Sequence, residues 1–115
     1  MKKLFIAAFI FVSTFTTNTF AEVKMGIILG FTGPIESLTP AMAASAELAF
    51  KEASDSGSLL DGKKIEVVRA DSTCVDSAAA TAAAEGVISQ GVAAIMGADC
   101  SGVTGAIASN VAVPN

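Results

Sequence analysis

A short stretch that contains glycine, aspartate, cysteine and serine, residues 97–101, carries the side chains most suited to chemistry in this chain. It follows the apolar run 92–96 and precedes a segment with the pattern of a helix. In a parallel α/β sheet such a junction lies at the carboxyl end of a strand, where the first N–H groups of the next helix can bind an anion. Ser101 is predicted to be the N-cap residue and to add a hydroxyl donor. We interpret this junction as a binding site for the carboxylate group of a ligand.

The two cysteines, Cys74 and Cys100, permit three interpretations: a metal pair, a redox couple or a structural disulfide. A zinc site usually needs four ligands, whereas this sequence has no histidine and no third cysteine. A disulfide is favoured if the chain is exported, because disulfides persist in oxidising compartments. Such a bond would contribute roughly 3–4 kcal/mol to stability through chain entropy.

Enzymatic interpretations lack essential groups. A serine hydrolase built on Ser101 would need a general base, which is usually histidine. The segment 97–104 resembles a phosphate-binding loop, but Val103 stands where that loop needs lysine. We therefore expect a binding protein that is not an enzyme, with no cofactor and no metal. A serine-type amide hydrolase or deaminase and an extracytoplasmic ligand-sensing domain remain as alternatives.

The first 21 residues have the three parts of an export signal. Lys2 and Lys3 form its charged start, residues 4–12 form its apolar core, and residues 19–21 form a small-x-small cleavage site. The apolar core is far shorter than the about 20 residues that a membrane-spanning helix needs. We therefore predict that the chain is exported and that the signal is cleaved after Ala21.

Removal of this signal leaves 94 residues, which suffice for one small domain. They carry 5 basic and 11 acidic side chains, a formal net charge of −6. The basic residues are scattered between Lys24 and Arg69 instead of forming a patch, so nucleic acid is not an expected partner. The abundance of Ala, Val and Ile fits helices that pack closely against a buried sheet.

Strand patterns and helix patterns alternate along the mature chain. The strands are near-continuous apolar runs, which suit a sheet covered on both faces. Thr39 is predicted to cap the first helix and Asp76 the second. Predicted strands cover residues 23–30, 64–70 and 92–96; predicted helices begin at Thr39 and end before Gly57, cover 77–90, and cover 102–110.

Within the first helix, apolar residues recur at spacings of three and four and are expected to pack on the sheet. Glu47, Lys51 and Glu52 are expected to face solvent. The predicted apolar stripe consists of Met42, Ala46, Ala49, Phe50 and Ala53.

The alternation predicts an α/β fold, a three-layer parallel sheet with helices on both faces and right-handed crossovers. The loops that follow the strands then share one edge of the sheet. Asp71 and Asp76 could form a carboxylate pair or a calcium loop there, although a strand-end role and a helix-cap role explain them more simply. Three strands leave part of the sheet uncovered, so we expect the chain to be a fragment of a larger domain.

Five segments in this order resemble the type I periplasmic solute-binding proteins of ABC importers, especially the group that binds leucine, isoleucine and valine. The resemblance covers residues 22–115 and implies the amino-terminal part of the first lobe of a two-lobe fold that closes on its solute by a hinge. The segments are 30–34 (GFTGP), 46–50 (AELAF), 60–64 (LDGKK), 71–76 (DSTCVD) and 97–102 (GADCSG).

The resemblance also implies functional residues. Ser101 would hold the carboxylate of an amino acid, and Cys74 would be joined to Cys100 by a disulfide. Leu38, in the loop after the first strand, and Asp99 and Cys100 would lie against the ligand. Leu38 and Asp99 depart from the family pattern. Family members often have an aromatic residue at the position of Leu38 and an apolar residue at the position of Asp99. An inward-facing Asp99 would disfavour an aliphatic ligand.

The function that this resemblance implies is the substrate-binding component of an ABC importer. The protein would capture an amino acid, of the branched-chain type, in the periplasm and deliver it to the permease in the inner membrane. The complete protein is expected to be a monomer.

Overall fold

The computed structural model describes residues 22–58 and 60–115. Its centre is a sheet of three parallel strands in the order β2-β1-β3, so that β1 pairs with both neighbours. Val23 of β1 lies beside Ile65 of β2, and Met25 of β1 lies beside Ala94 of β3. The predicted parallel α/β sheet is therefore confirmed. The strands are β1 (Val23–Leu29), β2 (Ile65–Asp71) and β3 (Ala94–Gly97).

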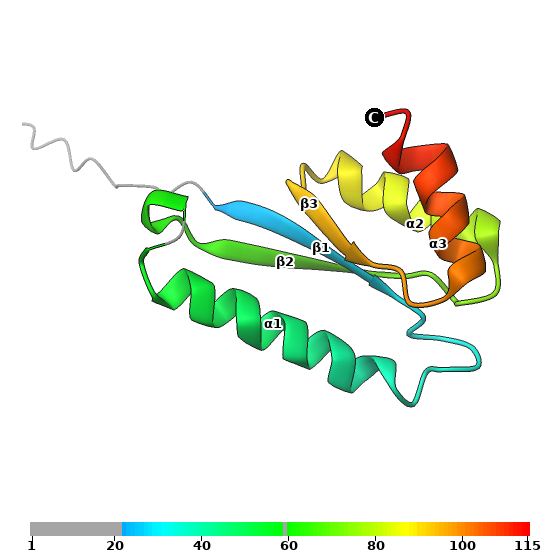
Figure 1. Cartoon of the computed structure of the whole chain (residues 1–115), viewed down its shortest axis with the longest axis horizontal. Coiled ribbons are helices and arrows are strands. Elements are labelled where there is room, and N and C mark those ends of the chain that lie inside the picture. Colours follow the sequence, from blue (N-terminus) through cyan, green and yellow to red (C-terminus); the bar gives the residue numbers. More distant parts are fainter. Residues whose placement is uncertain (1–21, 59) are drawn as a thin grey trace, which may run out of the picture.

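Helices cover both faces of the sheet, as predicted (Figure 1). Helix α1 (Thr39–Asp55) lies on one face, and α2 (Ser77–Ser89) and α3 (Ser101–Ile107) lie on the other. A π-helical segment, Ala108–Ala112, continues α3, and a short 3₁₀ turn, Leu60–Gly62, precedes β2. The loops after the three strands all lie at one end of the sheet, on the right in Figure 1.

The near-continuous apolar run of β1 follows from this layering, because successive side chains of a strand point to opposite faces. Ile27 and Leu29 are buried with Ala43 of α1. Ile28 points to the other face and is buried in a second cluster. The buried half of β1 lies between two helical layers, so Ile27, Ile28 and Leu29 all need to be apolar. The second cluster contains Ala80, Ala84, Val87, Val103, Ile107 and Val111 of the covering helices and their continuation.

Two helix starts differ from the prediction by one residue. Thr39 is the first residue of α1, and Leu38 is the N-cap of this helix. The buried Thr39 hydroxyl does not cap the helix, because it donates to the Gly30 carbonyl oxygen at 3.1 Å. Ser101 is the first residue of α3, and the extended residue Cys100 is its N-cap. The Asp76 cap is confirmed, since its carboxylate accepts from the Ala78 and Ala79 N–H groups.

The buried face of α1 also differs from the predicted stripe. Met42 is 44% exposed and Ala49 is exposed, whereas Ala43 and Ser54 are buried. Ser54 belongs to this face because its hydroxyl accepts the Ile65 N–H at 2.8 Å. A polar residue with a specific partner thus occupies a position that a purely apolar pattern assigns to solvent.

Glu47 was expected to face solvent but is only partly exposed. Its carboxylate accepts two hydrogen bonds from the Arg69 guanidinium of β2, at 2.5 and 2.7 Å. The same guanidinium lies over the Phe31 ring, 5.6 Å from its centroid. Helix α1, strand β2 and the loop after β1 therefore meet around one arginine.

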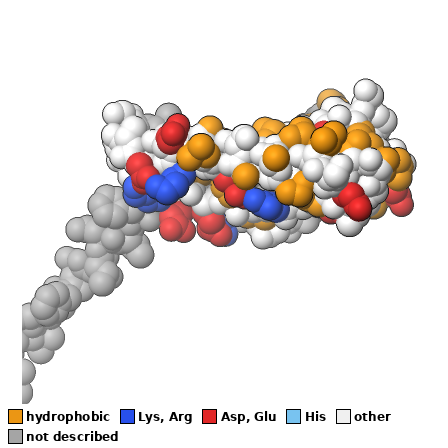
Figure 2. Space-filling model, turned by 90° about the horizontal axis from the view of Figure 1, so that it is seen from below, with side chains coloured by type: hydrophobic (Ala, Val, Ile, Leu, Met, Phe, Trp, Pro, Cys, Tyr) orange, Lys and Arg blue, Asp and Glu red, His pale blue; other side chains and the backbone are white. Residues whose placement is uncertain are grey.

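The surface on the α1 side is divided (Figure 2). Hydrophobic side chains gather toward the end of the molecule that carries the loops, and basic side chains lie toward the other end and the middle. Leu38 is 60% exposed and Met42 lies one turn along α1 from it. Apolar surface is thus available next to the loops.

The predicted export signal and its cleavage site lie outside the residues that the structure describes. Within 22–58 and 60–115, no helix combines the length and the apolar character needed to cross a membrane.

Candidate ligand-binding site

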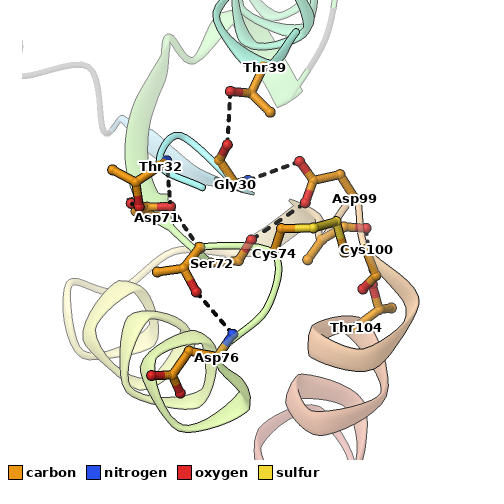
Figure 3. Close-up of a disulfide and its surroundings, with 12 residues drawn as sticks. Gly30, Thr32, Thr39, Asp71, Ser72, Cys74, Asp76, Asp99, Cys100 and Thr104 are labelled. Atoms are coloured by element: carbon orange, nitrogen blue, oxygen red, sulfur yellow. Dashed lines mark hydrogen bonds between the residues drawn. A yellow bond between two sulfur atoms is a disulfide. The ribbon is translucent and has the colours of Figure 1, made fainter. Parts of the chain in front are cut away.

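A disulfide joins Cys74 to Cys100 at the loop end of the sheet (Figure 3). Their Cα atoms are 5.2 Å apart. Cys74 lies in the loop after β2 and Cys100 is the N-cap of α3, so the bond connects segments that follow the two outer strands. It passes close to the end of β1, where a Cβ on Gly30 would lie 3.1 Å from the Cys74 Cβ. The disulfide that the family resemblance implies is present.

The carboxylate of Asp99 is directed at two neighbouring loops (Figure 3). Its Oδ2 accepts the Gly30 N–H at 2.9 Å, and its Oδ1 accepts the Ser72 hydroxyl at 3.4 Å. Gly30 follows β1 and Ser72 follows β2, so one side chain connects the loops of all three strands. Ser72 is fully buried.

Two glycines allow the backbones at this edge to approach each other closely. Gly97 has a φ of 132°, and a Cβ there would lie 1.9 Å from the Ile28 carbonyl oxygen. Gly33 has a φ of 98°, and a Cβ there would lie 2.5 Å from the Thr73 carbonyl oxygen. L-residues rarely adopt such φ values, so both positions require glycine.

Asp71 ends β2 and holds the loop after β1. Its carboxylate accepts from the Thr32 hydroxyl at 2.5 Å and from the Thr73 N–H at 2.8 Å. Burial raises the pKa of this carboxyl, but hydrogen bonds from Thr32 and Thr73 outweigh burial and hold the pKa below its usual value.

The metal-site interpretation of Asp71 and Asp76 gains no support. Asp71 binds the loop after β1, and Asp76 caps α2. No group of three or more His, Cys, Asp or Glu residues in the described part of the chain is arranged to hold a metal ion.

Ser101 stands exposed at the first position of α3. The first N–H groups of a helix have no partner within it, so a ligand at this position would meet both hydroxyl and backbone donors. The segment before Ser101 is fixed by the Thr104 hydroxyl, which donates to the Cys100 carbonyl at 2.9 Å and to the Ala98 carbonyl at 3.1 Å.

The structure brings the four predicted ligand residues to the same end of the sheet. Asp99, Cys100 and Ser101 are consecutive, and Leu38 follows the loop after β1. Of these, Cys100 is partly buried in the disulfide and Asp99 is occupied by neighbouring loops. A ligand contact by any of the four stays a prediction.

Sequence reasoning placed Gly30 and Ser72 within the family-like segments 30–34 and 71–76 but missed their hydrogen bonds to Asp99. The available signal for Ser72 was its place directly after a strand, within the segment 71–76. Nothing local indicated the partner of Gly30, which lies 69 residues away in the chain.

A groove of about 390 Å³ lies elsewhere, between α1 and the start of β2. Its walls include Phe50, Ile65 and Val67, and ion pairs of Asp55 with Lys51 and Lys64 lie across its rim. Lys64 and Ile65 place it at the amino end of β2, opposite the loops. It is therefore separate from the candidate site.

Comparisons with known proteins agree with the geometry. Residues 22–114 match the family model described as periplasmic binding protein. A search of curated proteins found no match. Among solved structures, the chain is similar to the branched-chain amino acid transporter substrate binding protein LivJ from Streptococcus pneumoniae str. Canada MDR_19A in complex with isoleucine, with 30% sequence identity and a TM-score of 0.70. The match covers 81% of this chain and 26% of that chain, so this chain spans about a quarter of that protein. The chain belongs to the periplasmic binding protein family.

Proposed function

We propose that this chain is part of the first lobe of a substrate-binding protein that serves an ABC importer. The protein captures an aliphatic amino acid, of the branched-chain type, in the periplasm and delivers it to a permease in the inner membrane. It acts without catalysis, as a monomer, and closes on its ligand by a hinge between two lobes. The export signal is removed after Ala21.

The single observation that carries this proposal is the likeness to a LivJ structure that holds isoleucine. The similarity extends over 81% of this chain. The apolar surface beside the loops, with Leu38 and Met42 exposed, suits an aliphatic side chain. Because both Asp99 oxygens accept hydrogen bonds from the protein, this carboxylate does not by itself oppose an aliphatic ligand.

Ser101 is the residue that we propose to hold the ligand carboxylate. Its hydroxyl is exposed at the start of α3, where the partial positive charge of a helix start favours an anion. The disulfide and the Thr104 hydrogen bonds hold this position in place. A preorganised donor loses little entropy on binding.

The decisive experiment is isothermal titration calorimetry on the protein expressed from its complete reading frame. Isoleucine, leucine and valine are titrated separately, with glutamate and urea as chemically distinct ligands. We expect heat of binding with the three aliphatic amino acids and none with urea. Binding of none of the amino acids would remove the proposal. N-terminal sequencing of the exported protein should begin at Glu22.

The variant Ser101→Ala tests the carboxylate contact. We expect affinity for isoleucine to fall about tenfold to a hundredfold, as for loss of a hydrogen bond to a charged group. Ser109→Ala is the matched control, because Ser109 is an exposed serine on the helical segment beyond α3. Equal affinities of the two variants would exclude Ser101 as the carboxylate ligand. Hydrolysis of an amide substrate that Ser101→Ala abolishes would favour the enzyme alternative.

A further inference from the structure

We infer that Asp99 is a positioning residue of the candidate site. Its carboxylate holds the loop that carries Ser101 against the loops after β1 and β2, and it does not contact the ligand. This inference rests on the proposed function and gives Asp99 a role that differs from the ligand contact predicted from sequence.

Each carboxylate oxygen of Asp99 has its own donor within the protein. Oδ2 accepts the Gly30 N–H at 2.9 Å, and Oδ1 accepts the Ser72 hydroxyl at 3.4 Å. Gly30 and Ser72 are buried, so water cannot simply replace the carboxylate. Buried donors that lose their acceptor are costly, and this cost holds the Asp99 side chain in its present direction.

The segment between Asp99 and Ser101 transmits this constraint. Cys100 is held on one side by the disulfide, and its carbonyl accepts the Thr104 hydroxyl at 2.9 Å. Since Ser101 follows directly, the Asp99 side chain sets where the Ser101 hydroxyl stands relative to Gly30. A displacement of about 1 Å in such a group is enough to weaken binding strongly.

The disulfide cannot replace this connection. It joins the Ser101 loop to the loop after β2, whereas the Asp99–Gly30 hydrogen bond joins the Ser101 loop to the end of the central strand β1. Gly30 is also fixed from the other side, because its carbonyl oxygen accepts the Thr39 hydroxyl at 3.1 Å. Asp99 therefore links the start of α3 to the start of α1 through Gly30.

Direct contact with the ligand carboxylate is also unfavourable on grounds of charge, because two like charges at close range repel each other. The competing role for Asp99 is a contact with the ammonium group of an amino acid. The two roles predict opposite results for asparagine, which has the shape of aspartate without its charge. Affinity is kept if Asp99 positions the loop and is lost if Asp99 contacts the ammonium group.

The experiment compares Asp99→Asn, Asp99→Leu and the wild type, in the protein from its complete reading frame. Isoleucine affinity is measured by calorimetry, and exchange of the Gly30 amide hydrogen is measured by NMR in the absence of ligand. Asparagine keeps an oxygen for the Gly30 N–H and offers an amide donor to the Ser72 hydroxyl. We expect Asp99→Asn to bind isoleucine within about threefold of wild type, and Asp99→Leu to bind at least about tenfold more weakly. Gly30 exchange should accelerate at least about tenfold in Asp99→Leu alone.

Two results would overturn the inference. If Asp99→Asn loses as much affinity as Asp99→Leu while its Gly30 exchange stays at the wild-type rate, Asp99 contacts the ligand. If Asp99→Leu folds and keeps both the affinity and the exchange rate, Asp99 positions nothing. Should Asp99→Leu not fold, Asp99→Ala takes its place, because alanine removes the acceptor of the Gly30 N–H without adding bulk. We expect the same acceleration of Gly30 exchange, and an unchanged exchange rate would overturn the inference.

Failure of the proposed function gives a different pattern. In that case the wild type binds none of the amino acids, yet the Gly30 exchange rates of the variants still show whether Asp99 holds the two loops together. Faster exchange in Asp99→Leu would then support the positioning of the loop, and unchanged exchange would overturn it.

Discussion

Cys74 and Cys100 are joined by a disulfide across the loop end of the sheet, with their Cα atoms 5.2 Å apart. The bond closes a segment with a sequence separation of 26 that contains all of α2 and β3. The outer strands β2 and β3 are thus connected covalently on the side where the ligand is proposed to bind. Loss of the disulfide should therefore affect the stability of the protein more than its binding of a ligand.

We expect Cys74→Ala, Cys100→Ala and the double variant each to lower the free energy of unfolding by about 3–4 kcal/mol in oxidising buffer, because the unfolded chain gains conformational freedom. The two changes should not add, since either one removes the same bond. Guanidinium titration measures the effect. Reduced wild type should match the variants, and an unchanged midpoint after reduction would contradict the prediction.

Gly97→Ala is expected to destabilise the protein by at least about 2–3 kcal/mol, because its φ is unfavourable for alanine and the Cβ would lie 1.9 Å from the Ile28 carbonyl oxygen. Gly105→Ala is the matched control. A Cβ on Gly105, within α3, would meet no atom within 4 Å, so this change should be neutral or stabilise by up to about 1 kcal/mol. Thermal unfolding of both variants measures the contrast, and equal midpoints would refute the close approach.

Asp71 should make the free energy of unfolding depend on pH. Its pKa is lowered in the folded protein, so its contribution is fully present above the ordinary carboxyl pKa of about 3.9 and is lost as the pH falls through the lower, folded value. Asp71→Asn should therefore lower stability at neutral pH and reduce the loss of stability between about pH 5 and pH 2. Unfolding free energies measured across this range test the slope.

Asp76→Ala removes the carboxylate that accepts the Ala78 and Ala79 N–H groups at the start of α2. We expect a loss of about 1 kcal/mol in the free energy of unfolding. Asp76→Asn should retain most of the stability, because the asparagine oxygen is an equally good cap. Urea titration distinguishes the two variants, and equal losses would mean that charge, not capping, is what Asp76 provides.

The order of the elements could be predicted because its causes are local. Apolar runs of strand length, alternating with the alanine-rich and proline-started segments, specify parallel strands and helices on both faces. Asp76 was identified as a cap because its partners lie two and three residues away. The disulfide partner followed from the presence of only two cysteines. The boundaries of the elements are predicted less accurately than their order: the third strand begins at Ala94 instead of residue 92.

The partners of Ser54 and Thr39 could not be predicted, because each partner lies in another element that only the fold brings close. Ser54 is buried since it meets Ile65, and Thr39 is not a cap since it meets Gly30.

By itself the sequence determined the parallel α/β layering, the family resemblance and the cysteine pair, since patterns of apolar, small and capping residues encode these locally. Tertiary structure alone decided the direction of Asp99, whose Gly30 donor lies 69 residues away and reaches it only when the parallel strands bring their carboxyl ends to one edge.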